Sequence, residues 1–68
     1  MEQTLFDYVK EQSYIKNKSL KEIAKDLEVS YPTIINIKHR APSRMTYHKF
    51  ANYFNIEVYD LLKFPIKK

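Results

Sequence analysis

The sequence predicts an all-α fold of five short helices in a single domain. The 68-residue chain contains no glycine, and none of its segments alternates apolar and polar residues as a half-buried strand does. Apolar residues instead recur at intervals of three and four, which is the helical period. Hydrophobic residues make up 44% of the chain, enough for one core at a length close to the lower limit for stable folding.

The first two helices are predicted from apolar stripes and one capping motif. A stripe of mainly apolar residues places the first helix at about residues 3–14, and Asn17 with Lys18 forms the corner after it. Ser19 opens a capping box with Glu22, because each side chain accepts a hydrogen bond from the other residue's backbone N–H. The face of the second helix consists of Leu20, Ile23, Ala24 and Leu27.

A third helix is predicted after a turn at Glu28 and Val29. Ser30 caps it, and Pro32 lies in its first turn, where a missing N–H is no loss. Because Pro42 disfavours helix at the residue before it, the third helix is expected to end near residue 39 or 40. Ile34 and Ile37 are expected inside, and Tyr31, Thr33, Asn36 and Lys38 outside.

Two more helices complete the bundle. Ser43 caps the fourth, and Asn55 ends it because asparagine tolerates the left-handed conformation. The stripe of the fourth helix consists of Tyr47, Phe50, Ala51 and Phe54. Within residues 57–68, Val58, Leu61 and Leu62 predict a short fifth helix that is followed by a tail.

The net charge of +4 lies in one segment. No Asp or Glu occurs between Glu28 and Glu57, whereas the rest of the chain contains eight Lys and all eight acidic residues. The basic residues of this segment are Lys38, Arg40, Arg44 and Lys49, with His39 and His48 beside them. A localised positive patch of this kind attracts phosphate groups.

A longer pattern supports this interpretation. Its residues are Ala24, Glu28, Val29-Ser30, Thr33-Ile34 and Ile37, then Pro42-Ser43, Phe50-Ala51, Phe54-Asn55-Ile56, Val58 and Leu61-Leu62. At unbroken spacing, this pattern resembles the Cro/C1-type (XRE-like) helix-turn-helix family of small phage-repressor-like proteins. The resemblance implies a compact lambda-repressor-like bundle, with the helix-turn-helix at about residues 19–40 of a single DNA-binding domain covering residues 1–68.

Three positions depart from the family pattern. Glu28 stands where the family has glycine in the turn, and it requires a positive φ or a modified turn at a cost on the order of 1 kcal/mol. Leu20 replaces a glutamine that often supports DNA contacts, and Arg40 replaces a glycine that often follows the third helix. The first departure concerns stability, and the other two change how DNA would be held.

The resemblance implies sequence-specific binding of double-stranded DNA, most simply by a transcriptional repressor whose helix 31–39 enters the major groove. The candidates for base contacts are Tyr31, Pro32, Thr33, Ile35 and Asn36. The amide of Asn36 can pair with adenine, and Pro32 and Ile35 can contact the methyl group of thymine. Because no arginine is available there to read guanine, we expect A·T-rich half-sites.

Phosphate contacts and a partner copy follow from the same resemblance. The candidates for phosphate contacts are Ser19, Lys38, Arg40 and Arg44. One module would hold DNA weakly, so a homodimer on an inverted repeat is expected. Its candidate interface consists of Val58, Tyr59, Leu62, Phe64 and Ile66. An equally weighted alternative is that Phe64 and Ile66 fold back to complete a small core.

Other classes of function were compared with DNA binding. An enzyme is not expected, nor is a metal site or cofactor, because the chain has no cysteine, no glycine-rich loop and no acid between its two histidines. Without a signal peptide or a long apolar run, a cytoplasmic location away from membranes is expected. The alternative function is a protein-interaction module, an antirepressor or partner-binding regulator, in which Tyr31, Pro32 and Ile35 contact a protein.

Overall fold

The computed structural model describes residues 3–67, and it confirms the all-α prediction. The described chain forms five helices and no strand: α1 Leu5–Lys16, α2 Leu20–Leu27, α3 Tyr31–Asn36, α4 Arg44–Phe54 and α5 Val58–Leu62. None of these helices is long and apolar enough to cross a membrane.

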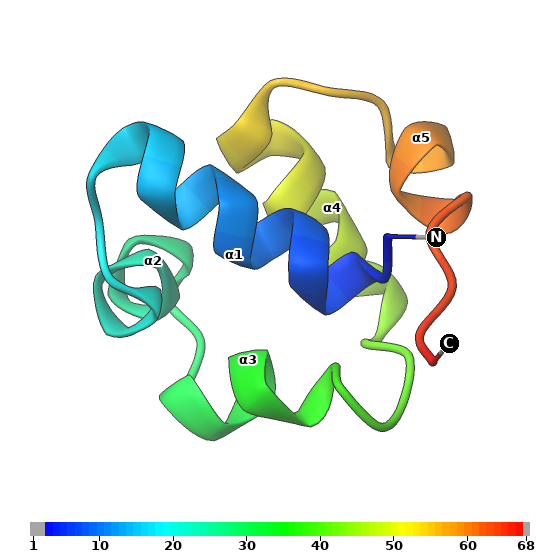
Figure 1. The fold of residues 1–68 in the computed structure, drawn as a ribbon, viewed down its shortest axis with the longest axis horizontal. Helices are drawn as coiled ribbons and strands as arrows, with labels where there is room; N and C mark the ends of the chain where they lie inside the picture. Colours follow the sequence, from blue (N-terminus) through cyan, green and yellow to red (C-terminus); the bar gives the residue numbers. More distant parts are fainter. Residues whose placement is uncertain (1–2, 68) are drawn as a thin grey trace.

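The helices pack around one core, and α3 lies at the edge of the molecule (Figure 1). Helix α2 packs against α1, α3 and α4, and α4 packs against α5. The core residues are Leu5, Val9, Ile23, Ala24, Leu27, Ile34, Ile37, Tyr47, Phe50, Ala51, Phe54 and Leu61. Since Ile34 and Ile37 anchor this segment from one side, the rest of α3 faces outward along the lower edge of Figure 1.

Side-chain caps explain where the first four helices begin. Ser19, Ser30 and Ser43 are N-caps as predicted, and the box between Ser19 and Glu22 is present. Helix α1 starts later than predicted, because Thr4 caps it and the Asp7 carboxylate accepts from the Thr4 N–H at 3.1 Å. This second capping box has Asp at the third position, so the usual Ser/Thr-x-x-Glu signature does not reveal it.

Helix α3 ends at Asn36, earlier than the predicted residue 39 or 40. The N–H groups of Lys38 and His39 donate to carbonyls three residues earlier, at 3.1 and 3.0 Å, so the chain continues as tight turns. The β-branched run from Thr33 to Ile35 has a low helix propensity, and the corner leading to Pro42 follows within one further turn. The outward-facing helix is therefore only six residues long.

The turn between α2 and α3 contains a glutamate in the left-handed conformation. Glu28 has φ 59° and ψ 40°, as the replacement of glycine in the turn predicts. The N–H of the next residue, Val29, donates to the carbonyl of Ala24 at 3.0 Å, which closes the end of α2. A non-glycine residue is strained in this conformation, so the turn between α2 and α3 carries a cost in stability.

The C-terminal tail folds back onto α1. The Phe64 ring stacks on Tyr8, with the ring centroids 4.8 Å apart. The N–H of Leu5, in the first turn of α1, donates to the carbonyl of Pro65 at 2.9 Å. Phe64 and Ile66 are half-buried and pack against the core. Of the two placements expected for them, a dimer interface or a return to the core, the structure has the return to the core.

Candidate nucleic-acid interface

The outer side of α3 presents most of the residues predicted to contact bases. Tyr31 is 39% exposed, Pro32 and Asn36 are exposed, and Ile35 is half-buried. Tyr31 with Ile35, and Pro32 with Asn36, are pairs separated by four residues, so each pair shares one side of the helix. Four of the five candidates therefore lie on one continuous outer surface.

The fifth candidate, Thr33, is engaged within its own helix. Its hydroxyl lies 2.7 Å from the hydroxyl of Ser30, and its backbone N–H donates to the same oxygen at 3.4 Å. The Thr33 side chain is half-buried. A hydrogen bond from this hydroxyl to a base would therefore compete with the contact that caps α3.

Lys21 is a residue of this surface that the sequence analysis missed. It lies in the first turn of α2, and its Nζ atom is 5.6 Å from the centroid of the Tyr31 ring. A cation over an aromatic face is attracted to it, so the contact holds a positive charge beside the start of α3. No sequence signal identifies Lys21, because the crossing of α2 and α3 is what brings it to Tyr31.

Ser19, a predicted phosphate contact, is occupied by its capping box. The Ser19 hydroxyl accepts from the Glu22 N–H at 3.1 Å, and the Glu22 carboxylate accepts from the Ser19 N–H at 2.9 Å. A phosphate at this end of α2 would meet the negative charge of Glu22. Lys21, one residue earlier than Glu22, supplies a positive charge in the same turn.

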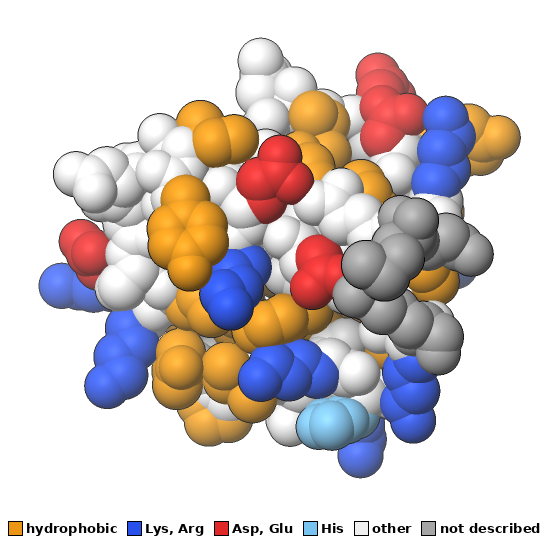
Figure 2. Space-filling view, in the orientation of Figure 1, with side chains coloured by type: hydrophobic (Ala, Val, Ile, Leu, Met, Phe, Trp, Pro, Cys, Tyr) orange, Lys and Arg blue, Asp and Glu red, His pale blue; other side chains and the backbone are white. Residues whose placement is uncertain are grey.

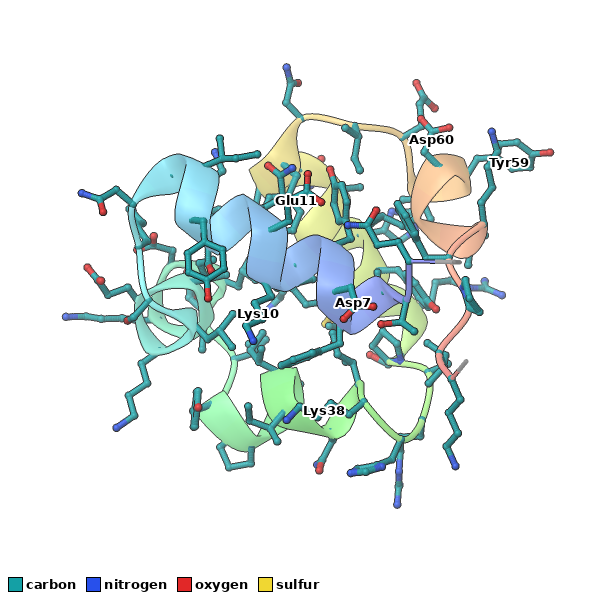
Figure 3. The ribbon with its side chains drawn as sticks, viewed as in Figure 1. Asp7, Lys10, Glu11, Lys38, Tyr59 and Asp60 are labelled. Carbon is teal, nitrogen blue, oxygen red and sulfur yellow. The ribbon has the colours of Figure 1, made fainter. Side chains whose placement is uncertain are left out.

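The other predicted phosphate contacts lie at and after the end of α3. Lys38 is placed with its Nζ atom 4.7 Å from the Phe6 ring of α1, and Figure 3 labels it at the level of α3, below α1. Arg40 and Asn36 line the same groove, of about 340 Å³, between α3 and the start of α4. Arg44 is exposed in the first turn of α4. The structure thus brings the predicted adenine-reading amide and one predicted phosphate contact together.

The electrostatics of this groove favour an anion. The sequence of α4 contains no Asp or Glu, and the Ser43 hydroxyl that caps it accepts from the Thr46 N–H at 3.3 Å. The positive end of the α4 dipole and the Arg40 guanidinium therefore act on the same space. Figure 2 shows basic, histidine and apolar side chains along the lower edge, where α3 lies, and the acidic side chains above it.

A solvent-exposed network links α2 to its neighbours. The Asp26 carboxylate accepts from Lys18 at 2.6 Å and from the Tyr53 hydroxyl at 2.7 Å, which joins the α1–α2 corner and α4 to α2. The hydrogen bonds from Lys18, and then from Tyr53, hold the pKa of Asp26 below its ordinary value of 3.8. The network therefore ties α2, against which α3 packs, to the rest of the bundle.

The candidate dimer residues divide into two groups. Tyr59 and Leu62 are 70% and 57% exposed on α5, and Figure 3 labels Tyr59 at the outer side of that helix. Val58, Phe64 and Ile66 are half-buried and pack against the core. Of the predicted interface, the pair on α5 is therefore the part that remains exposed to a second copy.

Comparison with models of protein families, with curated proteins and with solved structures gives no match to this chain. What the surface around α3 binds is therefore inferred from its residues.

Proposed function

We propose that this protein binds double-stranded DNA sequence-specifically and acts as a transcriptional repressor of the Cro/C1 type, with α3 in the major groove. The observation that carries the proposal is the outward side of α3 in a segment without Asp or Glu, with Lys21 beside its first residue and Arg40 and Arg44 after it. The major groove of B-DNA admits an α-helix, and flanking cations reach the phosphates on either side.

In this proposal Asn36 supplies hydrogen-bonded base recognition. Its exposed amide can donate a hydrogen bond to N7 of adenine and accept one from the N6 amino group, which makes a bidentate pair. Pro32 and Ile35 contribute apolar contacts to thymine, so an A·T-rich half-site fits the helix. Arginine is absent from α3, and the contact that most commonly reads guanine is therefore missing.

The phosphate contacts would give most of the affinity. With about four phosphates neutralised per subunit, a dimer is expected to show a slope of log K against log salt of roughly −7. Tyr59 and Leu62 on α5 are the contact between copies in this proposal. On an inverted repeat the half-sites would lie about 34 Å apart, which exceeds the longest dimension of one copy, 26 Å, so each half-site would be contacted by a separate copy.

The test is fluorescence anisotropy with a random-sequence duplex over a series of salt concentrations, followed by selection of the bound sequences. Tight binding with a steep negative salt slope, and enrichment of an A·T-rich inverted repeat, is the expected result. Arg40→Ala should weaken all sequences alike. Lys16→Ala removes one positive charge from the last turn of α1 and is the control, since that end of α1 lies away from both α3 and α5 (Figure 1).

The second candidate function is protein binding through the same helix, favoured by the exposure of Tyr31 and Pro32 and by Ile35 beside them. Apolar docking changes little with salt, whereas phosphate binding weakens steeply. Absence of DNA binding even at low salt would refute the DNA-binding proposal and leave the protein-interaction module, an antirepressor or other partner-binding regulator.

A further inference from the structure

The outer side of α3 is unusually apolar for a surface that reads DNA. Tyr31, Pro32 and Ile35, here called the apolar reading surface, lie together on a helix that contains no charged residue. Tyr31 and Pro32 are exposed, and Ile35 is half-buried but outside the hydrophobic core. These three side chains are not required to fill the core, so they are available to contact a ligand.

Three polar side chains around this surface already make contacts within the protein. The Thr33 hydroxyl contacts Ser30 at 2.7 Å, and the Lys38 ammonium lies 4.7 Å from the Phe6 ring. The Lys21 ammonium lies over the Tyr31 ring, on the flank of the surface. Hydrogen-bonded reading by α3 therefore rests on the Asn36 amide and the Tyr31 hydroxyl, and the rest of its contact area can distinguish bases by shape and apolar contact.

The apolar group that a base presents in the major groove is the methyl group on C5 of thymine. Cytosine carries a methyl group on the same ring carbon when it is methylated there. On the basis of the proposed DNA binding, we infer that the apolar reading surface recognises the 5-methyl group of pyrimidines, in 5-methylcytosine as well as in thymine. Methylation at C5 of a cytosine that this surface contacts then strengthens DNA binding instead of blocking it.

The size of the effect follows from burial of the methyl group. Removing one buried methyl group from the contact is expected to weaken binding about three- to fourfold. Because a dimer would contact two half-sites, removing one methyl group from each is expected to weaken it about tenfold. Unlike the phosphate contribution, this difference should be nearly independent of salt.

The experiment replaces thymine by uracil, one position at a time, in a duplex selected for tight binding. Uracil keeps every hydrogen-bonding group of thymine and lacks only the methyl group. We expect a loss of about threefold or more at one or two positions in each half-site. In a duplex with cytosine at those positions, 5-methylcytosine should restore a similar factor over cytosine.

Variants assign the effect to the surface. Ile35→Ala should remove the difference between thymine and uracil at one position, whereas Ile15→Ala removes the same atoms from an exposed site on α1 and should keep it. Thermal unfolding of both variants checks that they fold. Tight binding with equal affinity for thymine and uracil overturns this inference and leaves the DNA-binding proposal standing. A protein that binds no duplex overturns both.

Discussion

Helix α3 and the C-terminal tail both carry apolar side chains outside the main helical stripes, but these side chains differ in how far they are buried. In the tail, Phe64 stacks on Tyr8, and the Pro65 carbonyl accepts the Leu5 N–H that α1 cannot satisfy internally. On α3, Tyr31 stays 39% exposed. The difference teaches that an apolar residue is recruited to the core when backbone hydrogen bonding brings it there, and remains available for binding when its helix is already anchored from its other side.

The largest expected effect tests the structural role of the tail. Phe64→Ala removes a half-buried ring stacked on Tyr8 and is expected to lower the free energy of unfolding by roughly 2 kcal/mol. Ile15→Ala, at an exposed site on α1, should change it by less than about 0.5 kcal/mol. Urea denaturation measures both. Equal, small effects would contradict the assignment of the tail to the core.

The next effect tests the binding role of α3. Asn36→Ala is expected to lower affinity by about tenfold for the preferred base at a single position, with the free energy of unfolding unchanged, because the amide is exposed. Competition with duplexes that vary each position in turn measures it. A uniform loss over all positions would show that Asn36 contacts the backbone instead. Arg40→Ala is the comparison, since a phosphate contact carries no sequence information.

A smaller effect concerns the turn that sets the angle of α3. Glu28→Gly relieves the strain of a residue at φ 59° and should raise the free energy of unfolding by about 1 kcal/mol. Glu28→Ala keeps the Cβ atom that causes the strain at positive φ. It is therefore the matched control and should show no such gain in the free energy of unfolding. Urea denaturation of the two variants decides the matter. If alanine stabilises the protein as much as glycine does, the gain in the free energy of unfolding comes from removing the charge of Glu28 and not from relieving its backbone strain.

The smallest effect concerns the network of Lys18, Asp26 and Tyr53. The pKa of Asp26 is lowered in the folded protein, first by the hydrogen bond from Lys18, so its contribution to stability is present above the ordinary value of 3.8. That contribution is lost as the pH falls through the lowered pKa. Asp26→Asn should therefore be less stable than the wild type near neutral pH, and the difference should shrink on strong acidification. Thermal unfolding over a pH series measures this, and a difference independent of pH would exclude the carboxylate as its source.

Local sequence signals predicted most of the fold. The caps at Ser19, Ser30 and Ser43 and the inward placement of Ile34 and Ile37 are confirmed. They are predictable because each depends on residues within one or two helical turns. For Glu28 the family resemblance had left a positive φ or a modified turn open, and the structure has the positive φ. The end of α3 was predicted wrongly, because Pro42 limits the helix while the β-branched run inside it stops it sooner.

The residues on the outer side of α3, and the segment without Asp or Glu around it, could also be predicted from the sequence. The side chains that other helices bring to α3 could not be predicted in this way. That Lys21 lies over Tyr31, that Lys38 lies over Phe6 and that Thr33 is engaged by Ser30 are facts of side-chain contact. The first two depend on how α2 and α1 cross α3. These contacts determine which polar groups remain for DNA in the proposed function.

By itself the sequence determined the helices, their caps and the location of the net positive charge, because each of these is a property of neighbouring residues. Only the tertiary structure decided which apolar side chains near the C-terminus are buried and which are exposed. Phe64 and Ile66 pack against the core because the tail returns to the first turn of α1, and Tyr59 and Leu62 do not because they lie on the outer side of α5. Burial depends on contacts between distant segments, and periodicity within one segment does not specify them.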